Sequence, residues 1–156
     1  MSIQDLGNIG EFIAAIATLA TLIYLTTQIR QNTKTLRSNI YSSWVDTTSH
    51  SQLIQTQHPG VFVKAFDPNV PREDMSPEEL RIFTAWCFHV CNLFEANYLH
   101  HIEGAFDKQA FEAKHRNMIW TLNQPKIRQF WTSFSEQVYD RRFIDFVEQE
   151  VLQNDS

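Results

Sequence analysis

Apolar residues dominate one stretch near the beginning of the sequence, from Phe12 to Ile29, and no charged residue lies between Glu11 and Arg30. At a rise of about 1.5 Å per residue this stretch makes roughly 27 Å of helix, which approaches the thickness of about 30 Å of a membrane's hydrocarbon core. The pattern therefore predicts a transmembrane helix that anchors the chain in a lipid bilayer.

Two other kinds of segment share part of this pattern, a cleaved signal peptide and a buried helix of a soluble protein. A cleaved signal peptide begins with basic residues, whereas Asp5 and Glu11 make the region before this run acidic. A long buried helix of a soluble oligomer is the stronger alternative, because four threonines make the run only moderately apolar. Threonine hydroxyls can bond to carbonyl groups of their own helix, which makes them tolerable in lipid. These threonines are Thr18, Thr21, Thr26 and Thr27.

The residues after the apolar run, 30–57, contain neither glycine nor proline, so nothing there ends the helix. A narrow apolar stripe at helical spacing continues through Leu36, Ile40 and Trp44 among Gln, Asn, Ser and Thr. We expect the helix to leave the membrane and to continue as an amphipathic stalk, with Trp44 and Tyr41 packed against later helices.

The remainder of the chain, residues 58–156, predicts a second domain, a helical bundle. His58, Pro59 and Gly60 end the first domain, residues 1–57. A capping box then opens a broadly apolar helix that runs to His101 or Ile102 and stops at Gly104; its residues are Ser76, Pro77 and Glu79.

Three further helix starts follow the broadly apolar helix. Asp107 and Asp140 can cap helices, and Pro125 ends one helix and opens the next. No stretch alternates between apolar and polar residues in the manner of a strand. The predicted fold is all-α: a long transmembrane helix that continues into a cytoplasmic stalk, packed with about four further helices.

Small residues recur at four-residue steps along the predicted span, so they share one helical face. Such a face lets another helix backbone approach closely, and it predicts association with a second copy or with another membrane helix. The residues of this predicted packing face are Gly10, Ala14, Ala17, Thr18 and Thr21.

Basic residues follow the span, and no acidic residue appears again before Asp46. Because Lys and Arg are retained on the cytoplasmic side, we expect the N-terminus outside and the bundle in the cytoplasm. Arg30, Lys34 and Arg37 are predicted to lie at the membrane interface, where their side chains reach lipid phosphates.

A polar cluster marks the point where the helix leaves the predicted bilayer, and it consists of Gln28, Gln31, Asn32 and Thr33 together with Arg30. In an oligomer these groups could line a pore mouth or bind lipid headgroups. The alternative, which we favour, is an interfacial belt of the kind expected beside any membrane anchor.

Few features of the sequence indicate a catalytic or ligand-binding activity. The net charge is −5 and the basic residues are scattered, so no nucleic-acid-binding surface is predicted. No nucleophile elbow and no glycine-rich phosphate loop occurs, and no catalytic residue or cofactor is predicted. If Glu95 is buried, we expect an ion pair with Arg116 or Arg128.

Two groups of residues raise the question of a metal site. Glu112 and His115 form one E-x-x-H pair, whereas helical di-iron proteins use two such pairs and two further glutamates. Cys87 and Cys91 share one helical face, where cysteines usually act as small core residues. No metal site is therefore predicted, and a metal-dependent enzyme ranks last among the functional hypotheses.

A resemblance covers nearly the whole chain. LIYLTTQIRQNTKTLRSNIY (Leu22 to Tyr41), SPEELRIF, FEANY, FW and YDRRFIDFVEQEV resemble a family of small, uncharacterised bacterial membrane proteins. Those proteins have an N-terminal span running into a Q-I-R-Q-N-T segment, here Gln28 to Thr33, and a helical C-terminal half. The resemblance implies a bacterial inner-membrane location and implies no activity.

These observations together predict a non-enzymatic protein anchored in the inner membrane. Its bundle would mediate assembly, either as a homo-oligomer or as an accessory subunit of a larger membrane complex. The alternative is a homo-oligomeric channel in which Thr18, Thr21 and Gln28 face a central axis.

Overall fold

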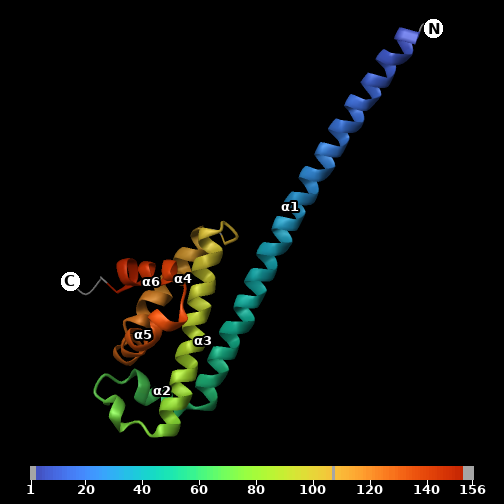
Figure 1. The fold of residues 1–156 in the computed structure, drawn as a ribbon. Helices are drawn as coiled ribbons and strands as arrows, with labels where there is room; N and C mark the ends of the chain where they lie inside the picture. The colour runs from blue at the N-terminus through green and yellow to red at the C-terminus, as the bar shows by residue number, and fades with distance from the viewer. Residues whose placement is uncertain (1–2, 107, 153–156) are drawn as a thin grey trace. The chain divides into compact units, whose positions relative to one another are not determined.

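A computed structural model describes residues 3–106 and 108–152 of the chain. Within these ranges every regular element is helical and no strand occurs, which confirms the all-α prediction (Figure 1). The first helix, α1 (Ile3–Gln57), is continuous through the predicted span and stalk. Nothing interrupts it because proline is absent and its two glycines, Gly7 and Gly10, lie near its start.

The chain divides into two compact units, Met1–Asn39 and Ile40–Ser156, so the division falls inside α1. The sequence placed the domain boundary after residue 57 instead. The last turns of α1 belong with the second unit because their side chains pack there: Trp44 is half-buried and Ser51 is buried.

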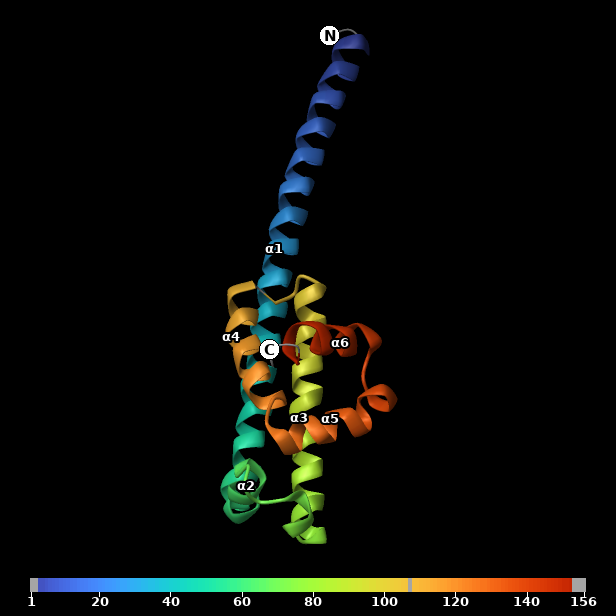
Figure 2. The same cartoon turned by 90° about the vertical axis from the view of Figure 1, so that its left-hand side faces the viewer.

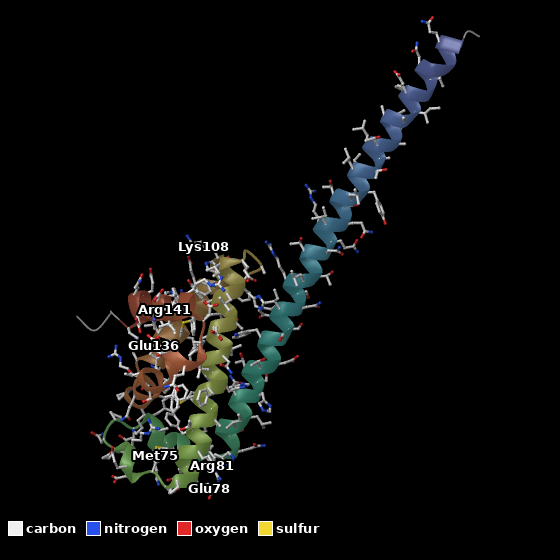
Figure 3. All side chains as sticks on the ribbon, in the orientation of Figure 1. Met75, Glu78, Arg81, Lys108, Glu136 and Arg141 are labelled. Carbon is white, nitrogen blue, oxygen red and sulfur yellow. The ribbon has the colours of Figure 1, made fainter. Side chains whose placement is uncertain are left out.

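In the first unit, every described side chain between residues 7 and 39 is exposed. Apolar residues are no exception, since Phe12 is 67% exposed and Ile23 is 66% exposed. Figure 3 shows these side chains projecting from the helix. The threonine hydroxyls donate back to their own helix, for example from Thr18 to the Ala14 carbonyl at 2.9 Å and from Thr21 to the Ala17 carbonyl at 2.8 Å.

The second unit is organised around α3 (Pro77–Ile102), which contacts α2, α4, α5 and α6 (Figure 2). The broad apolar face that the sequence shows for this helix accounts for its many neighbours. The surrounding elements are α2 (Pro59–Phe66), a 3-10 turn (Arg72–Asp74), α4 (Lys108–Leu122), α5 (Pro125–Val138), α6 (Arg141–Phe146) and a π-helical segment (Val147–Val151).

The predicted helix ends of α3 are present. Ser76 Oγ accepts from the Glu79 backbone N–H at 3.2 Å, and Glu79 Oε2 accepts from the Ser76 N–H at 2.7 Å. Lys64 adds a salt bridge to Glu79 at 2.8 Å, and this hydrogen-bonded ammonium is the main reason why the pKa of Glu79 is lowered. Gly104 follows the helix with φ of 73°, a conformation that glycine adopts without strain.

The later helix starts are also largely as predicted. Asp140 caps α6 by accepting from the Arg142 backbone N–H at 2.8 Å, and Pro125 opens α5. The predicted cap Asp107 lies outside the described residues. One detail was not predicted: the last helix ends in a π-helical turn, closed by a hydrogen bond from the Leu152 N–H to the Val147 carbonyl at 2.9 Å.

The core of the second unit is rich in aromatic rings. Phe143 is fully buried, its ring meeting Trp131 edge-on at a centroid distance of 5.5 Å and Tyr139 at 6.1 Å. Such edge-to-face pairs stabilise a core beyond the effect of area burial alone. Cys87 and Cys91 lie in the same core as free, fully buried thiols, as the sequence predicted for small core residues.

Glu95 has a different partner from the one expected. Its Oε1 accepts from the backbone N–H of Asp140 at 2.6 Å, where an arginine was predicted. Arg128 instead donates to Asn123 Oδ1 at 3.0 Å and to the Leu152 carbonyl at 2.9 Å. The half-buried carboxylate thus ties α3 to the start of α6, a long-range contact that residue spacing does not reveal.

Candidate functional site

The predicted packing face lies on the first unit and is open. Gly10, Ala14, Ala17, Thr18 and Thr21 are all exposed, and a Cβ atom added at Gly10 would meet no other atom within 4 Å. No described residue of the first unit covers this face. The helix is therefore free to receive another helix there, and the association itself stays a prediction.

The predicted interface residues and polar cluster also lie on exposed turns of α1. Arg30, Lys34 and Arg37 are exposed, as are Gln31 and Asn32. Two members of the cluster bond within their own helix: Gln28 Nε2 donates to the Tyr24 hydroxyl at 3.0 Å, and Thr33 Oγ1 donates to the Ile29 carbonyl at 2.9 Å.

The residues considered for metal binding occur as pairs on two different helices, α3 and α4. Across residues 3–106 and 108–152, no group of three or more His, Cys, Asp or Glu side chains is placed to hold a metal ion. His115 packs in an aromatic cluster, with ring centroids 5.8 Å from Phe111 and 5.3 Å from Phe146, and burial lowers its pKa. Burial raises the pKa of the Cys87 and Cys91 thiols, that of Cys91 to about 12.

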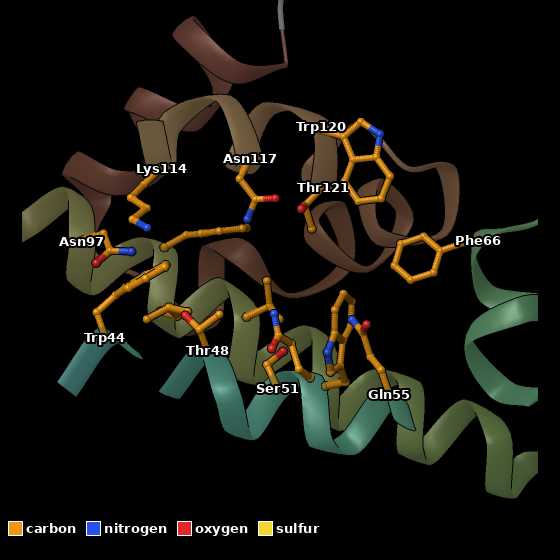
Figure 4. A pocket seen from close by; sticks show the side chains of 15 residues that line it. Trp44, Thr48, Ser51, Gln55, Phe66, Asn97, Lys114, Asn117, Trp120 and Thr121 are labelled. Carbon is orange, nitrogen blue, oxygen red and sulfur yellow. The ribbon is translucent and has the colours of Figure 1, made fainter. Parts of the chain in front are cut away.

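A cavity of about 240 Å³ lies inside the second unit, between the last turns of α1, the middle of α3 and the second half of α4 (Figure 4). Each helix presents one face to it, because the lining residues recur at three- and four-residue steps. They include Trp44, Thr48, Ser51 and Gln55 from α1, Trp86, Val90, Phe94 and Asn97 from α3, and Lys114, Asn117 and Thr121 from α4. Gln52, Leu93, Trp120 and Phe66 of α2 complete the lining.

Lys114 and Asn97 lie at one end of this cavity and point toward one another (Figure 4). The Lys114 ammonium lies 3.0 Å from the centroid of the Trp44 ring, a cation–π contact, and partial burial lowers its pKa. Asn97 is only 3% exposed, and its Nδ2 has no hydrogen-bond partner among the described residues. A buried amide N–H without a partner is costly, so this donor is unsatisfied by the chain's described residues.

The hydroxyl group of Thr48 is another polar group of this cavity without a hydrogen-bond partner among the described residues. Its Oγ1 is buried with no partner in the described part of the chain, although it lies in an α-helix where a bond to a preceding carbonyl is available. The adjacent Thr47 makes that bond, to the Ser43 carbonyl at 2.8 Å. The carbonyl of Thr47 in turn accepts from His89 Nε2 at 3.1 Å, which holds this part of α1 against α3.

Aromatic rings form the opposite end of the cavity, where Figure 4 shows Phe66 and Trp120. These two rings stack at a centroid distance of 5.8 Å and an interplanar angle of 24°. Phe66 also meets the ring of Trp86 edge-on at 5.8 Å. The cavity therefore has a cationic, donor-rich end and an aromatic end.

Sequence reasoning missed this cavity, although one signal was present. Asn97 continues the apolar face of Trp86, Val90 and Phe94 at helical spacing, so a polar residue interrupts a face that is otherwise buried. Lys114 gave no such signal, because a lysine within a helix is ordinarily a solvated surface residue.

Comparison with known proteins adds no assignment: no family model matches the chain, and no curated protein or solved structure is significantly similar to it. The family resemblance of the Gln28 to Thr33 segment thus stays a prediction.

Proposed function

We propose that this chain is a non-enzymatic, single-pass protein of the bacterial inner membrane, anchored by the apolar part of α1. The observation that carries the proposal is the exposure of that part: its large side chains from Phe12 to Ile29 are 49–67% exposed, and none is buried by the chain itself. A largely apolar surface of this kind needs lipid or another apolar surface to cover it.

The described helix Gly7–Gln57 is long and apolar enough to cross a membrane, by length and composition. The threonine hydroxyls support a lipid environment, since Thr18, Thr21 and Thr26 already donate to carbonyls of their own helix. The same bonds favour an anchor over a polar pore lining, because a pore needs polar groups that face its axis. Arg30, Lys34 and Arg37 support a cytoplasmic second unit.

The second part of the proposal is that the chain works by association, either as a homo-oligomer or as an accessory subunit of a larger membrane complex. The uncovered small-residue face around Ala14 and Thr18 supports it, because such a face allows a second helix to approach closely.

Native mass spectrometry of the protein, extracted from its own membranes in mild detergent, tests both parts. We expect the chain in the membrane fraction, with masses at a fixed multiple of its own mass or with the masses of partner subunits added. Recovery in the soluble fraction alone would disprove the anchor, and a strictly monomeric species would disprove association.

A further inference from the structure

The cavity between α1, α3 and α4 contains donors that no described residue satisfies. Asn97 Nδ2 and Thr48 Oγ1 are buried without partners, and Lys114 Nζ contacts the face of Trp44 but no described carboxylate. Leaving buried donors unpaired costs free energy, whereas one group with several acceptor positions would satisfy them together. A carboxylate is such a group, since its two oxygens accept several hydrogen bonds and its charge complements an ammonium.

The other end of the cavity indicates which chemical group the remainder of the ligand carries. Phe66 and Trp120 present ring surfaces there, and aromatic rings pack favourably against other rings in stacked or edge-on geometry. The size sets an upper limit, because a cavity of about 150 Å³ accommodates benzene, and in proportion the 240 Å³ here accommodates about ten non-hydrogen atoms. A single aromatic ring with a short acidic side chain has this size.

We infer that the cavity binds a small aromatic monocarboxylate, with the carboxylate between Lys114 and Asn97 and the ring against Phe66 and Trp120. On binding, the ammonium of Lys114 exchanges its contact with the Trp44 ring for an ion pair with the ligand. All of the residues involved belong to the second unit. The inference therefore does not depend on whether α1 crosses a membrane.

Calorimetric titration of the full-length protein in detergent with phenylacetate tests the inference. We expect saturable binding of one molecule per chain, and binding of the neutral amide phenylacetamide at least about tenfold weaker, because a charge-assisted hydrogen bond is stronger than a neutral one. Absence of saturable binding, or equal affinity for the acid and its amide, would overturn the inference.

Variants locate the site. Lys114→Met keeps the length of the side chain and removes its charge, so we expect phenylacetate to bind about tenfold more weakly. Lys108→Met is the matched control, because this lysine lies on the same helix, is 84% exposed and does not line the cavity. Unchanged affinity in Lys114→Met, or an equal loss in Lys108→Met, would overturn the assignment.

Asn97→Asp provides a second, independent variant. It keeps the shape of the side chain but replaces the amide donor with an acceptor of the ligand's own charge, so we expect phenylacetate binding to be abolished. The near-ultraviolet circular dichroism of each variant should match the wild type, which shows that the tryptophans remain packed. Retained binding in a folded Asn97→Asp variant would contradict the inference.

Discussion

The two parts of α1 differ in how far their side chains are buried. Between residues 7 and 39 even large apolar side chains such as Phe12 are exposed, whereas in the last turns polar Ser51 is only 7% exposed. The helix is continuous, so secondary structure does not account for the difference. It arises because the second unit covers the last turns, while nothing described in the first unit covers the apolar turns. Burial is therefore determined by the partner surface and not by the hydrophobicity of the residue.

The largest expected effect is a loss of packing in the second unit. Phe143→Ala removes a fully buried ring between Trp131 and Tyr139, and we expect it to lower the free energy of unfolding by about 3–5 kcal/mol. Phe12→Ala, at a site 67% exposed, is the matched control and should leave that free energy unchanged. Chemical denaturation followed by tryptophan fluorescence measures both; equal losses would mean that the two units do not differ in packing.

The reactivity of the two thiols measures how firmly the core of the second unit is closed. Cys87 and Cys91 are the only two cysteines of the sequence, and both are fully buried. Because burial raises the pKa of Cys91 from 9.0 to about 12, its thiolate fraction near neutral pH is smaller by roughly a thousandfold. We expect a maleimide to label the chain only after unfolding, measured by intact mass. Rapid labelling of the folded protein would show that this core opens.

A charge in the apolar part of α1 should weaken membrane insertion and leave the stability of the second unit unchanged. Leu19→Arg places a cation where the side chain is 60% exposed, and we expect it to disfavour membrane insertion by about 2.5–3.5 kcal/mol. The measurement is the fraction that resists alkaline extraction from membranes, with Leu19→Met as the control. An unchanged fraction would contradict the anchor, and a lower unfolding free energy of the second unit would contradict the separation of the units.

The smallest expected effect concerns the start of α3. Ser76→Ala removes the hydroxyl that accepts from the Glu79 N–H, and we expect a loss of about 1 kcal/mol in the free energy of unfolding. Ser133→Ala is the control, since that exposed hydroxyl only donates back to the Gln129 carbonyl of its own helix. Thermal unfolding in detergent distinguishes the two; an equal shift would mean that the cap contributes nothing specific.

Sequence reasoning succeeded where the deciding interactions are local. The capping box at Ser76 and Glu79 and the stop at Gly104 depend on residues within one turn, so spacing alone identified them. It failed for Glu95, because a backbone N–H far along the chain satisfies that carboxylate. It also assigned the last turns of α1 to the first domain, since helix continuity is local but packing is not.

A helix forms from contacts three or four residues apart, so the helices, most of their caps and the apolar run of α1 can be predicted from the amino-acid sequence. The cavity depends instead on the packing of three different helices, which brings Asn97, Thr48 and Lys114 together and places aromatic rings at the other end. Helix packing determines which polar groups are buried away from water. A buried donor without a partner can therefore be identified only in the folded chain.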